Sequence, residues 1–378
     1  MGSSNSPESQ ANPPATTEAT PCDARFLPPA WVHQTLRSGI VIPAHPLALT
    51  VNRKLDERRQ RALSRYYLAA GAKGLAVGSH TSQFAIRRPE HGLFQPMLEL
   101  AAITAQEHDE RTASKTVLIS GLCGETAQAM AEAKLARDLG YHVGMISLAA
   151  LPQANDDQLI AHCAAIADVI PIFGFYMQTA VGGRELSQGF WRRLAEIPNL
   201  VGIKMAPFNR YQTLDVLRGV ADSGRADEIA LYTGNDDNII CDLLTPFEIA
   251  SKAKTIPLRI VGGLLGHWAC WTQKAVEQLR QCHAARDNAA LYPQLLQLAA
   301  QVTECNAALF DVRNQFAGCI AGIHYVLKEQ GLLQNLIFLD PREQLSPGQQ
   351  EEIDRVRATY PHLNDDPFVA EHLDQWLA

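Results

Sequence analysis

Two side chains at the ends of predicted strands could together carry out nucleophilic and proton-transfer chemistry. Lys204 ends the apolar run 201–203, so we expect its ammonium group to point into a buried site. Burial disfavours the charged form of lysine and lowers its pKa, which leaves a free amine able to attack a carbonyl. Tyr176 ends the preceding strand, and its phenol could relay a proton or bind a substrate carboxylate. The alternatives are a lysine that reaches solvent or neutralises an aspartate, and a core tyrosine with a satisfied hydroxyl.

Small polar residues follow two other predicted strands. Gly78, Ser79, His80 and Thr81 form a turn whose backbone N–H groups and hydroxyls could bind a carboxylate. His80 could also act as an acid or base near neutral pH. A second turn, Gly234-Asn235, ends a later strand and supplies further candidates for substrate binding.

The elements that would position these residues alternate regularly along the chain. Short apolar or β-branched runs occupy residues 39–43, 74–78, 116–120, 143–148, 170–175, 200–204, 229–233 and 258–261. Segments with helical periodicity lie between them, at 56–70, 125–139, 156–167, 187–197 and 212–222. This alternation is typical of parallel sheets, and eight such units predict an α/β fold of the (β/α)8 TIM-barrel type. A doubly wound open sheet is the alternative. In a barrel, the reactive side chains are expected at the carboxyl ends of the strands.

Several residues mark the expected ends of helices. Asn155 or Asp156 can cap the helix 156–167, Ser187 can cap the next helix, and Gly140 suits the position after a helix end. Further helices are expected at 274–290, 292–316 and 319–330, and Ser346 with Pro347 should begin another. The predicted domains are therefore a disordered tail (1–30), a barrel (31–275) and a C-terminal helical module (276–378). The helical module shows no chemistry of its own.

Composition limits the classes of function. The chain has 378 residues, of which 47% are hydrophobic and 19% charged, enough to bury a large core. With 33 Lys and Arg against 40 Asp and Glu, the net charge of −7 provides no footprint for nucleic acid or an anionic membrane. The 8 cysteines are scattered without metal-binding or disulfide spacing, and no apolar run is long enough to span a bilayer. The Ser/Pro/Thr-rich beginning of the chain lacks the apolar core of a secretory signal, so we expect a cytoplasmic protein.

Taken together, the candidate residues and their surroundings resemble one enzyme superfamily, the dihydrodipicolinate synthase / N-acetylneuraminate lyase superfamily of class I Schiff-base aldolases. The similar segments are Gly71–Gly78, Phe175-Tyr176, Pro198–Lys204, Thr233–Asp237 and Lys328–Leu333, within a similarity running from about Gly39 to Val356. The resemblance implies a barrel in which Lys204 forms a Schiff base with pyruvate or another 2-oxo acid. It implies that Tyr176 is the proton-relay phenol, and that Ser79 and His80 stand where the keto-acid carboxylate binds.

The sequence departs from this family at residues that choose the second substrate. The family usually has Gly-Thr/Ser-Thr-Gly-Glu after the second strand, whereas this chain has Gly78-Ser79-His80-Thr81-Ser82. The Pro-Tyr-Tyr motif of the synthases is replaced by Ala149-Ala150-Leu151, and their Asn, Pro and Arg after the relay tyrosine by Met177–Val181. We therefore expect a divergent member and not a standard dihydrodipicolinate synthase.

Three hypotheses remain. The first is a lyase, aldolase or dehydratase that uses a Lys204 Schiff base, needs no cofactor or metal, and acts on a small 2-oxo acid as a homo-oligomer (a dimer or tetramer). The second is a metal-dependent barrel enzyme, with His45, His80, Glu125, Asp236 and Asp237 as possible ligands. The third is a non-catalytic member of the family that binds a keto acid without turnover.

Overall fold

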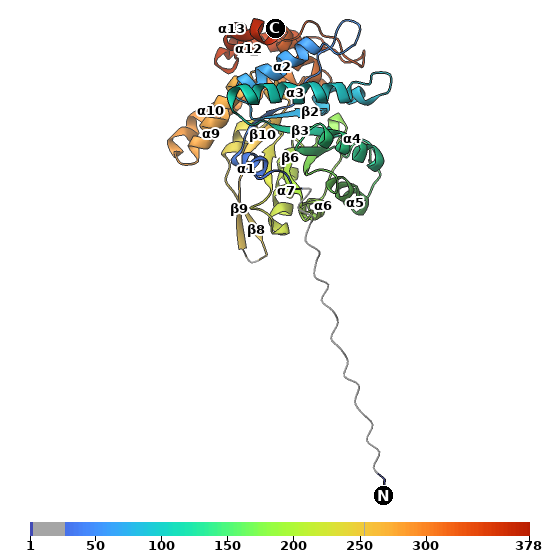
Figure 1. Ribbon diagram of the computed structural model, residues 1–378. Helices are drawn as coiled ribbons and strands as arrows, with labels where there is room; N and C mark the ends of the chain where they lie inside the picture. The colour runs from blue at the N-terminus through green and yellow to red at the C-terminus, as the bar shows by residue number, and fades with distance from the viewer. Residues whose placement is uncertain (3–26, 253) are drawn as a thin grey trace.

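The computed structural model describes residues 1–2, 27–252 and 254–378 (Figure 1). The prediction of a disordered tail falls mainly on residues 3–26, which lie outside the described residues. Helix α1 (Ala30–Ser38) begins at residue 30, which is the last residue of the predicted tail. None of the described helices is long and apolar enough to cross a membrane.

Eight parallel strands form a nearly closed barrel. They are β1 (Val41–Pro43), β2 (Gly74–Val77), β3 (Val117–Leu122), β4 (Val143–Ile146), β5 (Ile172–Met177), β6 (Leu200–Ala206), β7 (Ala230–Thr233) and β10 (Gly262–Leu265). Their order is β1-β10-β7-β6-β5-β4-β3-β2. The ring closes between β1 and β2 through a parallel bridge of Ala44 with Ala76, where the His45 amide donates to the Ala76 carbonyl at 2.8 Å. The predicted (β/α)8 barrel is confirmed, and the open-sheet alternative is wrong.

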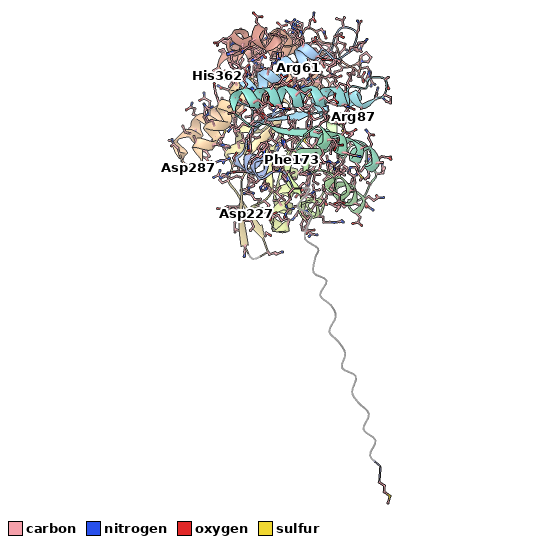
Figure 2. All side chains as sticks on the ribbon, viewed as in Figure 1. Arg61, Arg87, Phe173, Asp227, Asp287 and His362 are labelled. Atoms are coloured by element: carbon pink, nitrogen blue, oxygen red, sulfur yellow. The ribbon has the colours of Figure 1, made fainter. Side chains whose placement is uncertain are left out.

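Side chains alternate between the inside and the outside of the barrel, because successive residues of a strand point to opposite faces. On β5, Phe173, Phe175 and Met177 belong to the cluster that fills the barrel interior. Their neighbours Ile172 and Tyr176 belong to the larger cluster between strands and helices. Figure 2 labels Phe173 near the middle of the molecule, and this side chain is fully buried.

The helices of the barrel follow the predicted pattern. They are α2 (Glu57–Ala69), α3 (Phe94–Thr112), α4 (Thr126–Asp138), α5 (Asp156–Ala167), α6 (Gln188–Ala195), α7 (Arg210–Ser223), α8 (Ile239–Leu244) and α9 (Thr272–Ala285). Asn155 caps α5 in a reciprocal capping box with Gln158, and the Ser187 hydroxyl accepts the Phe190 amide at 3.0 Å. Gly140 follows α4 with φ +85°. These predicted helix ends are confirmed.

The predicted eighth strand, 258–261, is wrong. Leu258 instead ends β9 (Lys254–Leu258), which pairs with β8 (Phe247–Ser251) in an antiparallel hairpin. Figure 1 shows this hairpin at the end of the molecule opposite the C-terminal helices. The barrel strand is β10, whose first residues are Gly262 and Gly263. A Cβ at Gly262 would lie 2.6 Å from the Ile40 carbonyl oxygen, and one at Gly263 would lie 2.6 Å from the Trp268 ring. These close approaches require glycine, which hides the strand from a hydrophobicity pattern.

The C-terminal residues form four α-helices: α10 (Tyr292–Leu309), α11 (Cys319–Glu329), α12 (Gln349–Thr359) and α13 (Asp366–Leu377). Short 3-10 helices complete the described elements: η2 (His80–Ser82), η3 (Phe84–Arg87), η4 (Thr179–Val181), η5 (His267–Ala269), η6 (Ala289–Leu291), η7 (Val312–Asn314) and η8 (Pro361–Leu363). Helix α13 lies beside α2, where the buried Tyr66 hydroxyl donates to Asp365 at 2.8 Å (Figure 1).

Three predicted helix boundaries in this region are wrong. The helix predicted at 274–290 is α9, which ends at Ala285. The helix predicted at 292–316 ends at Leu309, because Asp311, Gln315 and Phe316 have positive φ values that an α-helix cannot contain. Ser346 does not cap a helix, since α12 begins at Gln349, after Gly348 in a left-handed conformation. The Ser346 hydroxyl donates to the Asp311 carboxylate instead.

The close approach of β1 and the segment before β10 can be tested at Gly39. Gly39 has φ +81°, and a Cβ there would lie 1.9 Å from the Val261 carbonyl oxygen. Gly140 has a similar φ of +85° with open space around it, which makes it a matched control. Gly140→Ala should cost about 1–2 kcal/mol of unfolding free energy from backbone strain alone. Gly39→Ala should cost about 1–3 kcal/mol more, since the backbones must also separate. Urea denaturation of both variants measures the difference, and equal losses would contradict this account.

Candidate active site

A cavity opens at the carboxyl ends of the barrel strands, with an empty volume of about 560 Å³ that includes its open mouth. It combines a few polar groups with many apolar side chains, as small-molecule sites do. The lining residues are Ser79, His80, Thr81, Phe175, Met177, Gln178, Val181, Lys204, Ala206, Phe208, Gly234, Asp236, Gly266, Phe310, Phe316, Cys319 and Ile323. Of the predicted site residues, the cavity brings together Lys204, Ser79, His80, Thr81 and Gly234.

Lys204 lies inside the barrel on β6 and is 7% exposed. Its neighbour across the ladder is Phe175 of β5, and its Nζ lies 4.5 Å from the centre of the Phe175 ring. Burial lowers the pKa of Lys204, although the negative charge of Asp236 acts in the opposite direction. The free amine is therefore accessible at a lower pH than for a lysine in water. This is the state that can attack a carbonyl.

Asp236 is the second buried ionisable group of the cavity. It follows β7 and accepts a hydrogen bond from the His267 amide at 2.9 Å. Burial raises the pKa of its carboxyl group, which the Lys204 ammonium opposes. The pKa values of the two groups are thus shifted toward each other, as expected for buried groups of opposite charge. Asp236 was predicted only as a possible metal ligand, and it lines the same cavity as Lys204.

The turn after β2 offers an unpaired hydroxyl. The Ser79 Oγ is buried, lines the cavity and has no hydrogen-bond partner in the described residues. A buried hydroxyl without a partner is costly, and a ligand oxygen would satisfy it. His80 lies at the same wall, and burial together with the Lys204 charge lowers its pKa to about 4. Its imidazole is therefore neutral near pH 7.

Arg87 holds this turn in place from behind. Its Nη2 donates to the Gly78 carbonyl at 2.9 Å and to the Gly121 carbonyl at 2.8 Å. Its Nε pairs with Glu132 at 2.9 Å, and its guanidinium stacks 4.3 Å from the centre of the Phe94 ring. The ends of β2 and β3 are thus tied together by one side chain, which the sequence analysis did not identify.

Tyr176 lies outside the cavity. Its side chain is on the outer face of β5, where the ring packs against Trp191 at 5.1 Å and the hydroxyl accepts the Leu186 amide at 3.2 Å. The inward position opposite Lys204 is Phe175. The structure therefore does not bring the phenol and the amine together, and the core-tyrosine alternative describes Tyr176. The alternation of Phe173, Phe175 and Met177 was the sequence signal for the inward face.

Gly78 and Asn235 support the cavity without lining it. Gly78 has φ +78° and forms the turn that presents Ser79. The buried Asn235 amide donates to Asp242 at 2.9 Å, and its oxygen accepts the Phe208 amide at 3.0 Å. Asn235 therefore positions the lining residue Phe208 and does not itself line the cavity.

The residues considered as metal ligands are dispersed. The ring of His45 is buried against Ser64 at 2.8 Å, and Asp237 pairs with Arg210 at 3.2 Å. Glu125 is exposed at the beginning of α4. Across residues 27–252 and 254–378, no three His, Cys, Asp or Glu side chains are grouped so that they could hold a metal ion.

The C-terminal region contributes four lining residues that were not predicted: Phe310 and Phe316 between α10 and α11, and Cys319 and Ile323 on α11. The expectation that this region has no chemistry of its own stays a prediction, but the region forms one wall of the cavity. Nothing in the strand–helix pattern of the barrel indicates this contact.

Comparison with known proteins gives distant sequence relatives. No family model matches the chain. It is 29% identical over 204 residues to a 4-hydroxy-tetrahydrodipicolinate synthase of Aromatoleum aromaticum, covering 52% of this chain and 62% of the relative. It is 27% identical over 210 residues to the enzyme of the same name from Azoarcus sp., covering 54% and 65%. The matches thus span less than two thirds of these relatives' own length.

Solved structures match over more of the chain. A dihydrodipicolinate synthase from Oceanobacillus iheyensis has a TM-score of 0.69 at 16% identity, covering 88% of this chain and 99% of that one. The Acinetobacter baumannii dihydrodipicolinate synthase, complexed with pyruvate, has a TM-score of 0.67 at 19% identity, covering 85% and 98%. The CdNal protein of Clostridium difficile, in complex with mannosamine, has a TM-score of 0.67 at 13% identity, covering 85% and 99%. At such low identity these likenesses establish the fold.

The charge coupling inside the cavity predicts how Lys204 titrates. Asp236→Asn removes the carboxylate that favours the ammonium, so the pKa of Lys204 should fall by about one unit or more. Asp237→Asn is the matched control: Asp237 pairs with Arg210 and raises the pKa of Asp236, so its removal should not lower the pKa of Lys204. The pH dependence of reductive methylation at Lys204, followed by mass spectrometry, measures the shift. An unchanged or raised midpoint in Asp236→Asn would contradict the coupling.

Proposed function

We propose that this chain, a divergent member of the dihydrodipicolinate synthase / N-acetylneuraminate lyase superfamily, is a Schiff-base lyase or aldolase acting on a 2-oxo acid. The observation that carries the proposal is the buried Lys204 amine in a cavity that also contains the unpaired Ser79 hydroxyl. An amine and a hydroxyl at one site match the ketone and the carboxylate of a 2-oxo acid such as pyruvate.

The carboxylate would bind at the turn after β2. The Ser79 hydroxyl would donate to one carboxylate oxygen, and backbone amides of residues 79–81 would be available to the other. The turn is pre-organised by the Arg87 contacts to Gly78 and Gly121, so binding does not have to order it.

Lys204 would then attack the ketone carbon. Its nitrogen forms a bond to that carbon, the oxygen takes up a proton, and loss of water leaves a protonated imine. The imine withdraws electrons from the neighbouring bond, which permits C–C cleavage, condensation or dehydration.

We assign the proton transfers of these steps to Asp236, which lines the same cavity as Lys204. Its carboxylate can accept a proton from the attacking amine and return it to the leaving water. His80 is a weak base because its pKa is lowered to about 4, Phe175 has no proton to give, and the Cys319 thiol has a pKa raised well above its ordinary value. Asp236 therefore takes the role that the sequence analysis gave to Tyr176.

One observation favours a second candidate function. Phe175 occupies the inward position opposite Lys204, where a phenol would otherwise face the amine. A non-catalytic member that binds a keto acid in the same cavity would tolerate this apolar residue. A homo-oligomeric state, a cytoplasmic location and independence of cofactors stay predictions.

Schiff-base formation is tested by borohydride reduction. Incubation with pyruvate and borohydride should add a reduced pyruvyl group to Lys204, detected in the tryptic peptide by mass spectrometry. Lys204→Arg should abolish the adduct, because a guanidinium does not form the imine. Lys274, half-buried and paired with Glu277, is an internal control that should stay unmodified. Absence of any adduct across a panel of 2-oxo acids would overturn the proposal.

Proton transfer can be measured without knowing the second substrate. A catalytic imine should exchange the methyl protons of pyruvate with deuterium, which proton NMR follows directly. Asp236→Asn should slow this exchange by on the order of 10²–10⁴-fold while the borohydride adduct still forms. Trapping without exchange in the unaltered protein would favour the non-catalytic alternative. Undiminished exchange in Asp236→Asn would remove Asp236 from the proton-transfer role.

A further inference from the structure

The outer part of the cavity contains a cluster of three phenylalanine rings. Phe208 follows β6, while Phe310 and Phe316 come from the segment between α10 and α11. The Phe208 ring stacks on Phe310 at 6.4 Å with an interplanar angle of 22°, and meets Phe316 edge-on at 5.7 Å. Phe310 is buried, whereas Phe208 and Phe316 are partly exposed to the mouth. This aromatic wall has free ring surface facing the cavity that a ligand could cover.

The backbone at two of these rings is held in an unusual conformation. Phe208 has φ +52° and Phe316 has φ +67°, in the left-handed region that bulky residues rarely adopt. The Phe208 amide is held by Asn235, and the Phe316 amide donates to the Asp311 carbonyl at 3.0 Å. Strained residues that are fixed in this way gather at ligand sites. The rings of the aromatic wall are therefore held in fixed positions by their backbone hydrogen bonds and are not loosely packed on the surface.

The charges of the cavity limit what else can bind there. Among the described residues that line it, Lys204 is the only lysine or arginine, and its nitrogen would be used by the imine. The nearest part of α7 carries Arg210, but its guanidinium is committed to Asp237 and Asp242. A second carboxylate on the substrate would meet phenylalanine rings and Asp236, with no cation to offset its desolvation. The cavity therefore disfavours dicarboxylic 2-oxo acids.

We propose that the substrate is a 2-oxo acid with a single carboxylate and an aromatic or bulky apolar group, which packs against Phe208, Phe310 and Phe316. This inference rests on the proposed function, since it assigns the keto-acid end of the molecule to Lys204 and Ser79. Aromatic rings gain from burial and from edge or offset contacts with other rings. Specificity for the apolar end would then come largely from the C-terminal residues.

The test compares 2-oxo-4-phenylbutanoate with 2-oxoglutarate in the borohydride reaction, with pyruvate as the reference. The concentration for half-maximal labelling of Lys204 should be about tenfold or more lower for the phenyl acid than for 2-oxoglutarate. We define the ratio as the half-maximal concentration of 2-oxoglutarate divided by that of the phenyl acid. Phe316→Ala should reduce this ratio. Val312→Ala should preserve it, because Val312 is exposed on the same segment and outside the cavity lining. A ratio near one, or a preference for 2-oxoglutarate, would overturn the inference.

A second measurement separates this inference from the Schiff-base proposal. Calorimetric titration with 3-phenylpropanoate and with glutarate probes the cavity with acids that have no ketone. Tighter binding of 3-phenylpropanoate supports the aromatic preference even if no imine forms, in which case the proposed function alone fails. Labelling by pyruvate together with equal or weaker binding of 3-phenylpropanoate would overturn the aromatic preference and leave the proposed function intact.

Discussion

The candidate site depends on keeping a lysine amine away from water inside an apolar barrel. The interior residues around Lys204 include Phe173, Phe175 and Tyr232, and the ammonium has Asp236 as its counter-charge. The charged ammonium is unfavourable in this environment, so the pKa of Lys204 is lowered and the neutral amine forms more readily. The same desolvation that burdens the folded state increases the fraction of Lys204 present as the free amine at a given pH. Closure of the ring at Ala44 and Ala76 maintains that environment, because an open sheet would admit water to the lumen.

A buried ion pair fixes the geometry of the turn after β2. Arg87 and Glu132 are each 8% exposed at their side chains and pair at 2.9 Å. Buried ion pairs contribute little net stability, because desolvation offsets their attraction. Here the pair fixes the directions of the hydrogen bonds that Arg87 gives to Gly78 and Gly121. Gly121 must lack a side chain for this arrangement, since a Cβ there would lie 2.4 Å from the Gly78 carbonyl oxygen. The geometry of the Ser79 turn thus follows from residues that never touch the cavity.

The barrel could be predicted because the alternation of strand and helix is repeated along the chain. An error in one unit therefore does not change the predicted fold. The prediction failed at β10, because the close approach of neighbouring atoms requires glycine at the start of this strand. Glycines there leave no apolar pattern to indicate a strand. It identified Lys204 and Ser79, because polar residues at strand ends are informative on their own. Tyr176 was expected in the cavity but lies on the outer face of its strand. The end of a strand defines the position along the barrel axis, whereas the alternation of side chains along the strand decides which of them face inward. Phe310 and Phe316 were beyond reach, since contacts between distant segments leave no local pattern.

The cavity is assembled from parts of the chain that are synthesised far apart in time. All eight barrel strands are complete at Leu265, but Phe310, Phe316 and Cys319 follow later, and Asp365 must arrive before Tyr66 finds its partner. A nascent barrel on the ribosome would therefore present an open apolar mouth and an uncovered α2. Such surfaces invite misassembly until the C-terminal helices dock. Lys204 therefore becomes enclosed only after the segment that carries Phe310, Phe316 and Cys319 has been synthesised and has docked on the barrel.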